Sequence, residues 1–146
     1  MKTCAEIMTI NPTCCLSTDT VSKAAQRMQK ENVGSIPVIE SEQSKKLIGI
    51  VTDRDLALKV IADGHDTKLT TVGDVMTDKV VTCRGEDDVQ KAVEAMAKHQ
   101  LRRIPVVDHD NMILGIISQA DIATRGVQPE KTAEMVKDIS QPKAEK

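Results

Sequence analysis

The amino-acid sequence predicts a mixed α/β (α+β) fold in which two β-α-β-β-α repeats pack together as a pair and a C-terminal helix follows them. The first observation is an internal repeat, because a shift of 68 residues places Met8 on Met76 and Pro37 on Pro105. The second is that each half combines a helix-period pattern of apolar residues with short apolar runs typical of strands. We therefore expect both halves to share one fold.

Each repeat is predicted to begin with a short helical turn and a brief strand. The turns are expected at residues 3–8 and 71–76, where a threonine is followed three positions later by an acid. The brief strands are expected at residues 13–16 and 80–83. An amphipathic helix comes next, because apolar residues recur at i, i+3, i+4 and i+7. These apolar positions are Val21, Ala24, Ala25 and Met28 in the first repeat and Val89, Ala92, Val93 and Met96 in the second.

The next part of each repeat is predicted to be a pair of strands joined by a turn. The first strand, at residues 35–40 or 103–108, contains a proline that cannot donate a ladder hydrogen bond. We therefore expect this strand to lie at an edge or to start irregularly. Polar residues 41–46 and 109–111 turn the chain into the second strand.

A second helix is expected to close each repeat. It begins at Asp53 and at Gln119, and in the first repeat it ends near Gly64, because glycine is favoured just past a helix C-terminus. A C-terminal helix with Pro129 at its first position follows. Its apolar face is Thr132, Met135, Val136 and Ile139. The predicted organisation is a first domain at 3–64, a linker at 65–70, a second domain at 71–126, and a helix and tail at 127–146.

The composition argues against several classes of function. The chain has 146 residues, 40% of them apolar, and it lacks Phe, Tyr and Trp, so its core must be aliphatic. A net charge of −2 provides no basic surface for nucleic acid or anionic lipid. No apolar run approaches the length of a membrane span. We therefore expect a soluble cytoplasmic protein that binds neither nucleic acid nor membrane.

The cysteines and histidines show no pattern typical of a metal site. No C-x-x-C pair occurs, and two of the cysteines are adjacent, which suits neither a zinc site nor a disulfide framework. The histidines lie far apart in the sequence. We expect reduced, half-buried thiols and no metal. The residues concerned are Cys4, Cys14, Cys15, Cys83, His65, His99 and His109.

One motif occurs in both repeats, at residues 49–55 and again at residues 115–121. A glycine and two aliphatic residues lead into a hydroxyl residue, Thr52 or Ser118, and an aspartate follows three positions later. The pattern predicts a strand that runs into a helix with the hydroxyl residue as N-cap, and such a turn attracts anions. An alternative stays open, because Thr52 with Asp55 and Ser118 with Asp121 also have the spacing of a capping box that binds nothing.

With its I-P-V strand and this repeated motif, the chain resembles tandem cystathionine β-synthase (CBS) domains, which together form a Bateman module. The resemblance covers residues 3 to 125 and is closest to small bacterial proteins made of one CBS pair. It implies a pseudo-twofold pair with two clefts that hold AMP, ADP, ATP, NAD or S-adenosylmethionine in many relatives. It also implies that Asp55 and Asp121 accept the ribose hydroxyls while Thr52 and Ser118 approach the phosphate.

The resemblance further implies that the two clefts differ. In related modules, basic residues before the I-P-V strand of one domain reach the phosphate held by the other domain's aspartate. Those residues here are Arg102 and Arg103, whose counterparts are Gly34 and Ser35. The Asp55 cleft is therefore expected to bind phosphate better, unless both arginines are solvated surface residues. The full candidate ligand-binding set is Gly34, Ser35, Ile36, Pro37, Thr52, Arg54, Asp55, Arg102, Arg103, Ser118 and Asp121.

These features predict a sensor module that is not an enzyme, requires no cofactor, and signals the binding of an adenosine-containing ligand to an unknown protein partner. No Ser-His-Asp, paired-carboxylate or metal constellation is evident. A homodimer is expected through exposed helical faces. The residues assigned to those faces are Ala57, Ile61, Ile122 and Ala123. The alternatives are an interaction module with vestigial clefts and a thiol or metal sensor that uses Cys14, Cys15 and Cys83.

Overall fold

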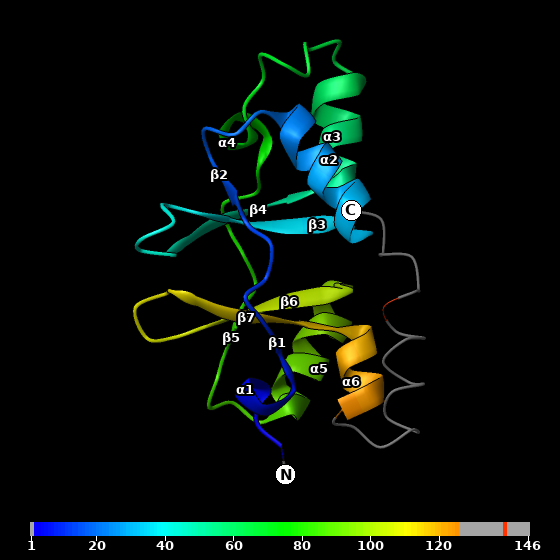
Figure 1. Ribbon diagram of the computed structural model, residues 1–146. Helices are drawn as coiled ribbons and strands as arrows, with labels where there is room; N and C mark the ends of the chain where they lie inside the picture. The colour runs from blue at the N-terminus through cyan, green and yellow to red at the C-terminus, as the bar shows by residue number, and fades with distance from the viewer. Residues whose placement is uncertain (1, 126–138, 140–146) are drawn as a thin grey trace. The chain divides into compact units, whose positions relative to one another are not determined.

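The computed structural model describes residues 2–125 and Ile139, and these residues form two compact units (Figure 1). Of the described residues, unit 1 contains 2–11, 81–125 and Ile139, and unit 2 is Pro12–Val80. The predicted mixed α+β fold is confirmed, since each unit has its own sheet covered by helices. No helix among the described residues has the length and apolar character needed to cross a membrane.

Unit 2 is built on a three-stranded sheet in the order β2-β3-β4. Strand β2 pairs with β3 in parallel, and β3 pairs with β4 in antiparallel fashion. Figure 1 shows α2 and α3 on one face of this sheet. Its elements are β2 (Cys15–Leu16), α2 (Val21–Glu31), β3 (Ser35–Ile39), β4 (Leu47–Thr52), α3 (Asp53–Leu56), the π-helix η1 (Ala57–Ile61) and α4 (Val72–Val75).

Unit 1 repeats this plan with one more strand, in the order β1-β7-β6-β5. Strand β5 is parallel to β6, and β7 is antiparallel to both of its neighbours. Helix α1 packs against α5 and α6, and all three helices contact the sheet (Figure 1). The elements are α1 (Cys4–Ile7), β1 (Thr9–Ile10), β5 (Cys83–Arg84), α5 (Val89–His99), β6 (Arg103–Val107), β7 (Ile113–Ser118) and α6 (Gln119–Arg125).

The compact units do not coincide with the sequence repeats. The first segment of each repeat belongs to the unit that holds most of the other repeat. Helix α1 and strand β1 open the first repeat, yet β1 pairs with β7, with Thr9 opposite Ile116. Helix α4 opens the second repeat, yet the Val72 N–H donates to the Asp19 carbonyl of unit 2 at 2.8 Å. The predicted division at 3–64 and 71–126 follows the repeats, whereas in the compact units each opening segment belongs with the other repeat.

Helices α2 and α5 are capped in the same way at both ends. Thr20 and Asp88 cap the N-termini by accepting backbone N–H bonds, and Asn32 and Gln100 end the helices in the left-handed conformation at φ 54°. The predicted apolar face of α5 is buried throughout. In α2 the prediction was wrong at Ala25, which is exposed. A single methyl group gains little from burial, so its side of the helix is weakly determined.

The prolines of β3 and β6 lie inside the sheets without breaking them. Strand β2 pairs only with Val38 and Ile39, so on that side no strand stands opposite Pro37. On the other side Pro37 faces Ile50 of β4. The predicted edge position was wrong, because β3 lies between β2 and β4 and β6 lies between β5 and β7, and the short strands β2 and β5 instead leave each proline without a strand on one side. Pro105 is opposite Ile116 on its other side.

Each unit has its own aliphatic core. The core of unit 2 includes Val38 and Val51 from the sheet and Val72 and Val75 from α4. The core of unit 1 includes Ile122, which is fully buried, so its assignment to an exposed dimer face was wrong. Successive helical residues point about 100° apart, and α6 turns Ile122 inward while Ala123 is exposed. The predicted C-terminal helix lies outside the described residues except for Ile139, which is buried in the core of unit 1.

Candidate functional site

Each unit contains a buried carboxylate where the last strand of its sheet runs into a helix. Asp55 is 9% exposed and Asp121 is 8% exposed, and no other charged side chain of the described residues is buried. Burying a charge is costly unless other groups stabilise it. The contacts around these two aspartates therefore decide what they can do.

The Asp55 carboxylate is held by the turn that precedes it. The Thr52 N–H donates to Asp55 Oδ2 at 2.9 Å, and the Asp55 N–H donates to Thr52 Oγ1 at 3.0 Å. These reciprocal bonds are the predicted capping box. The ammonium group of Lys59 lies 3.0 Å from Asp55 Oδ1. Each carboxylate oxygen thus has one donor close to it, and its second lone pair is available for a further donor.

The Asp121 carboxylate has the same capping bonds and an additional hydroxyl donor. The Ser118 N–H donates to Oδ2 at 3.0 Å, and the Asp121 N–H donates to Ser118 Oγ at 3.1 Å. The Thr9 hydroxyl lies 3.1 Å from Oδ1 and 3.2 Å from Oδ2. Arg125 stands 4.0 Å from Oδ1. Because a hydroxyl of the chain already contacts this carboxylate, Asp121 is more fully engaged than Asp55.

The other candidate residues of unit 2 surround the turn at Thr52. Ser35 is opposite Thr52 in the β3–β4 register, and the Asp53 N–H donates to the Gly34 carbonyl at 2.8 Å. A Cβ on Gly34 would meet Asp53 Oδ2 at 2.9 Å, so a side chain at this position would require the exposed carboxylate of Asp53 to shift. Arg54 is exposed. The remaining two candidates, Ile36 and Pro37, are buried in β3.

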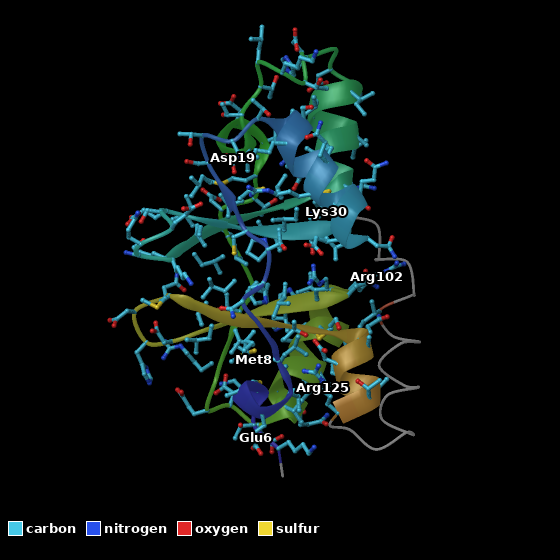
Figure 2. All side chains as sticks on the ribbon, viewed as in Figure 1. Glu6, Met8, Asp19, Lys30, Arg102 and Arg125 are labelled. Carbon is cyan, nitrogen blue, oxygen red and sulfur yellow. The ribbon has the colours of Figure 1, made fainter. Side chains whose placement is uncertain are left out.

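The candidate residues of unit 1 form the corresponding turn around Ser118. Arg103 is opposite Ser118 in the β6–β7 register, and the Gln119 N–H donates to the Arg102 carbonyl at 3.2 Å. Figure 2 shows Arg102 beside the start of β6, where its side chain is exposed. Burial lowers the pKa of Arg103, and the negative charge of Asp121 opposes this shift. The predicted use of Arg102 and Arg103 by a ligand at Asp55 joins residues of different units and stays a prediction.

The sequence analysis missed three residues that contact the carboxylates, namely Lys59, Arg125 and Thr9. Lys59 and Arg125 each follow an aspartate by four positions, the spacing at which helical side chains meet. That spacing was a usable signal. Thr9 could not be found in this way, because it reaches Asp121 only after β1 joins the sheet of unit 1.

The thiol of Cys14 shows no sign of being reactive. Burial raises the pKa of Cys14 to about 11, so this thiol is protonated at neutral pH and is a poor nucleophile. Burial also raises the pKa of Cys15. In unit 1, a hydrogen bond between Cys4 and Cys83 lowers the pKa of Cys4 and raises that of Cys83. Within the part of the chain that the structure describes, no three His, Cys, Asp or Glu side chains gather as a metal site.

Comparison with known families and curated proteins shows what this arrangement resembles. The CBS domain family matches the chain twice, at residues 4–62 and 72–127. The CBS domain-containing protein YhcV of Bacillus subtilis is 35% identical over 135 residues, which are 92% of this chain and 89% of that protein. Hypoxic response protein 1 of Mycobacterium tuberculosis is 32% identical over 144 residues, covering 99% of this chain and 98% of that protein.

Solved structures with the same fold include ligand and metal complexes. Hypoxic Response Protein I with two coordinated zinc ions has a TM-score of 0.76 and 31% identity over 85% of this chain and 98% of that one. The CBS domain pair of protein MJ0100, in complex with 5′-methylthioadenosine and S-adenosyl-L-methionine, has a TM-score of 0.72 and 28% identity, covering 84% and 94%. CBSX2 in complex with AMP has a TM-score of 0.71 and 25% identity, covering 94% and 99%.

Proposed function

The chain belongs to the CBS domain family, and we propose that it is a non-catalytic sensor that binds an adenosine-containing ligand and signals this binding to a partner protein. The ligand class is AMP, ADP, ATP, NAD or S-adenosylmethionine, and its place is in the clefts between the two CBS domains. The candidate contacts are Asp55 and Asp121 for the ribose and Thr52 and Ser118 for the phosphate.

One observation carries this proposal: each unit holds a buried carboxylate at a strand-to-helix turn, with acceptor capacity beyond its present contacts. Two hydroxyls on adjacent carbons, such as those of ribose, can donate to one carboxylate at the same time. Complexes of related CBS pairs with AMP and with S-adenosyl-L-methionine support the adenosyl class. Asp55 is the preferred site because, among the residues that the structure describes, no hydroxyl contacts its oxygens, whereas Thr9 contacts Asp121.

Thermal stabilisation by ligand tests the proposal. Compounds that bind only the native state raise its apparent stability, so at least one of AMP, ADP, ATP, NAD and S-adenosylmethionine should raise the Tm at millimolar concentration. Inosine monophosphate and ribose 5-phosphate are matched controls for the adenine base. If none of the adenosyl compounds shifts the Tm, the clefts are vestigial and an interaction module becomes the better description. Because the chain lacks Trp and Tyr, an absorption scan of the purified protein also reveals any co-purified adenine.

We further propose that the protein forms a homodimer through exposed apolar helical residues. Ile61 is 71% exposed and Leu58 is 48% exposed on η1, and Ala57 and Ala123 are also exposed. Apolar side chains gathered on one helix favour burial against a partner. Light scattering should return twice the chain mass across the micromolar range, and Ile61→Lys should shift the mass toward the monomer. A monomer mass for the unsubstituted chain would reject this part of the proposal.

A zinc sensor is the second candidate, because the related Hypoxic Response Protein I holds two coordinated zinc ions. The described residues of this chain do not form a cluster of three metal ligands. Elemental analysis of the purified protein decides between the two. Stoichiometric zinc that Cys14→Ser or Cys83→Ser removes would favour the metal sensor.

A further inference from the structure

Two basic side chains link the candidate ligand carboxylates to the helical turns that open the repeats. Lys59 Nζ lies 3.0 Å from Asp55 Oδ1 and donates to the Val75 carbonyl, at the end of α4, at 3.0 Å. Arg125 lies 4.0 Å from Asp121 Oδ1 and donates to the carbonyls of Ile7 and Met8, at the end of α1, at 3.3 Å each. Figure 2 labels Arg125 and Met8 in unit 1.

The two linkages are the same construction made twice. Val75 and Ile7 are equivalent under the 68-residue repeat, and each basic residue follows its aspartate by four positions. The last carbonyls of a helix have no intrahelical donor and carry partial negative charge. A cation placed between such a carbonyl and a carboxylate satisfies both, since an ammonium group has three donors and a guanidinium group has five.

We propose that Lys59 and Arg125 are positioning residues that fix the ligand carboxylates and couple them to α4 and α1, so that ligand binding at Asp55 is transmitted to the segment at residues 72–77 through Lys59. The part of this inference that involves a ligand rests on the proposed function. The part that joins the carboxylate to the helical turn stands on the contacts of the chain itself.

The location of Lys59 is suited to this coupling. It lies in the middle of η1, and π-helical turns occur frequently at functional sites. At its start, α4 is held by backbone bonds from Val72 and Gly73 to the carbonyls of Asp19 and Ser17. At its end, the side chain of Lys59 reaches the Val75 carbonyl, and Thr77 exchanges backbone bonds with Ile50 at 2.8 Å. Ligand binding at the Asp55 carboxylate can therefore affect the end of α4 more than its start.

The direction of the coupling follows from the contacts of the carboxylate. The Thr52 N–H donates to Oδ2 of Asp55, and the Lys59 ammonium group lies beside Oδ1. These contacts fix the orientation of the second lone pairs toward a ligand diol. A bound ligand would in turn restrain the carboxylate and, through Lys59, the end of α4. Coupling free energies are reciprocal, so a change that loosens α4 must also weaken binding.

Hydrogen exchange of the whole, ligand-free protein tests the linkage first. Lys59→Met should speed exchange of the Met76 and Thr77 amides by about fivefold or more, because one charge-assisted hydrogen bond is lost, while Lys59→Arg should retain protection. Lys23→Met is the matched control. The Lys23–Asp19 pair at 3.3 Å has side-chain exposures of 52% and 10%, against 48% and 11% for Lys59–Asp55. Protection of α2 amides verifies that each variant is folded.

The carboxylate must be part of the same linkage. Asp55→Asn should therefore also speed exchange at Met76 and Thr77, and the double variant with Lys59→Met should exchange no faster than the faster single variant. The proposal would be overturned if the increases in exchange rate of the two single variants multiplied in the double variant. Equal exchange rates at Met76 and Thr77 in Lys59→Met and Lys23→Met would overturn it as well. The repeat-related variant Arg125→Met should speed exchange at Met8 in the same way.

AMP serves as the probe for the ligand-dependent part, at a concentration that saturates its effect on the Tm. AMP should slow exchange at Met76 and Thr77 in the unsubstituted chain and in Lys23→Met, but not in Lys59→Met. If AMP protects these amides equally in Lys59→Met, the coupling is refuted even though binding is real. If none of the five adenosyl compounds raises the Tm, the proposed function fails, and the ligand-free exchange alone decides on the linkage.

Discussion

Asp55 and Asp121 each have a structural role that is separable from their candidate role in binding. Both accept a backbone N–H in a capping box, so removal of either side chain should lower the free energy of unfolding by about 0.5–2 kcal/mol without any ligand. A stability loss in these variants is therefore expected under both interpretations of the motif. Only the loss of ligand affinity separates the two.

Arg103 gives the sharper test at the residue scale. If it contacts the phosphate of a ligand at Asp55, Arg103→Ala should weaken AMP by about 1.5–3 kcal/mol and leave adenosine little changed, because only AMP has the phosphate. Asp55→Ala should weaken both compounds, since both carry the ribose. Calorimetric titration of AMP and adenosine measures these differences.

Asp121→Ala is the matched control for that experiment, because its capping geometry equals that of Asp55. It should leave the tighter binding phase nearly unchanged. The predicted asymmetry would be wrong if both aspartate variants lost equal AMP affinity while Arg103→Ala lost none. Lower AMP affinity in Asp121→Ala and Arg103→Ala alone would assign the arginine to the carboxylate of its own unit.

At the scale of elements, Gly115 permits the close approach of β1 to β7. A Cβ at this position would meet Met8 Sδ at 2.7 Å and the Thr9 carbonyl oxygen at 2.7 Å. Gly115→Ala should therefore lower the free energy of unfolding by about 1–3 kcal/mol through overpacking, as measured by urea denaturation. Adding Met8→Ala should recover only part of this loss, because the backbone contact remains. A variant as stable as the unsubstituted chain would show that β1 can shift at little cost.

The internal repeat predicted the order of helices and strands well. It did not predict which element each of them packs against. Val21 and Val89 begin helices as expected, and Thr52 and Ser118 cap the predicted turns. Periodicity identifies an apolar side without identifying what covers it, so β1 and the exchange of the opening segments were not foreseen. The same limit explains Ile122, whose burial depends on how α6 is rotated against the sheet.

The candidate site was predicted in part for a similar reason. Local spacing identified the aspartates and their capping residues, because those contacts lie within four positions of one another. Thr9 reaches Asp121 from the other end of the chain, and no local pattern indicates such a contact.

At the scale of the whole molecule, the exchange of opening segments predicts which fragments can fold. Residues 12–80 retain α4, whereas residues 3–64 lack it and lose Val72 and Val75 from the core. Burial of each valine contributes about 1.5–3 kcal/mol, a large share of a typical stability of about 5–15 kcal/mol. Fragment 12–80 should therefore show a cooperative thermal transition by circular dichroism, and fragment 3–64 should not. The reverse result would mean that the repeats, not the compact units, are the folding domains.

The pairing of β1 with β7 also has a consequence for biosynthesis. The ribosome makes residues 2–11 before unit 2, yet their strand partner at Ile113–Ser118 is made only after unit 2. Unit 2 is complete once residue 80 has emerged, so it can fold while the rest is being made. The N-terminal segment must wait with Cys4 and Ile7 uncovered. These apolar side chains are thus made before unit 2 and are buried only after unit 2 is complete, and a chaperone that binds nascent chains would meet them throughout this interval.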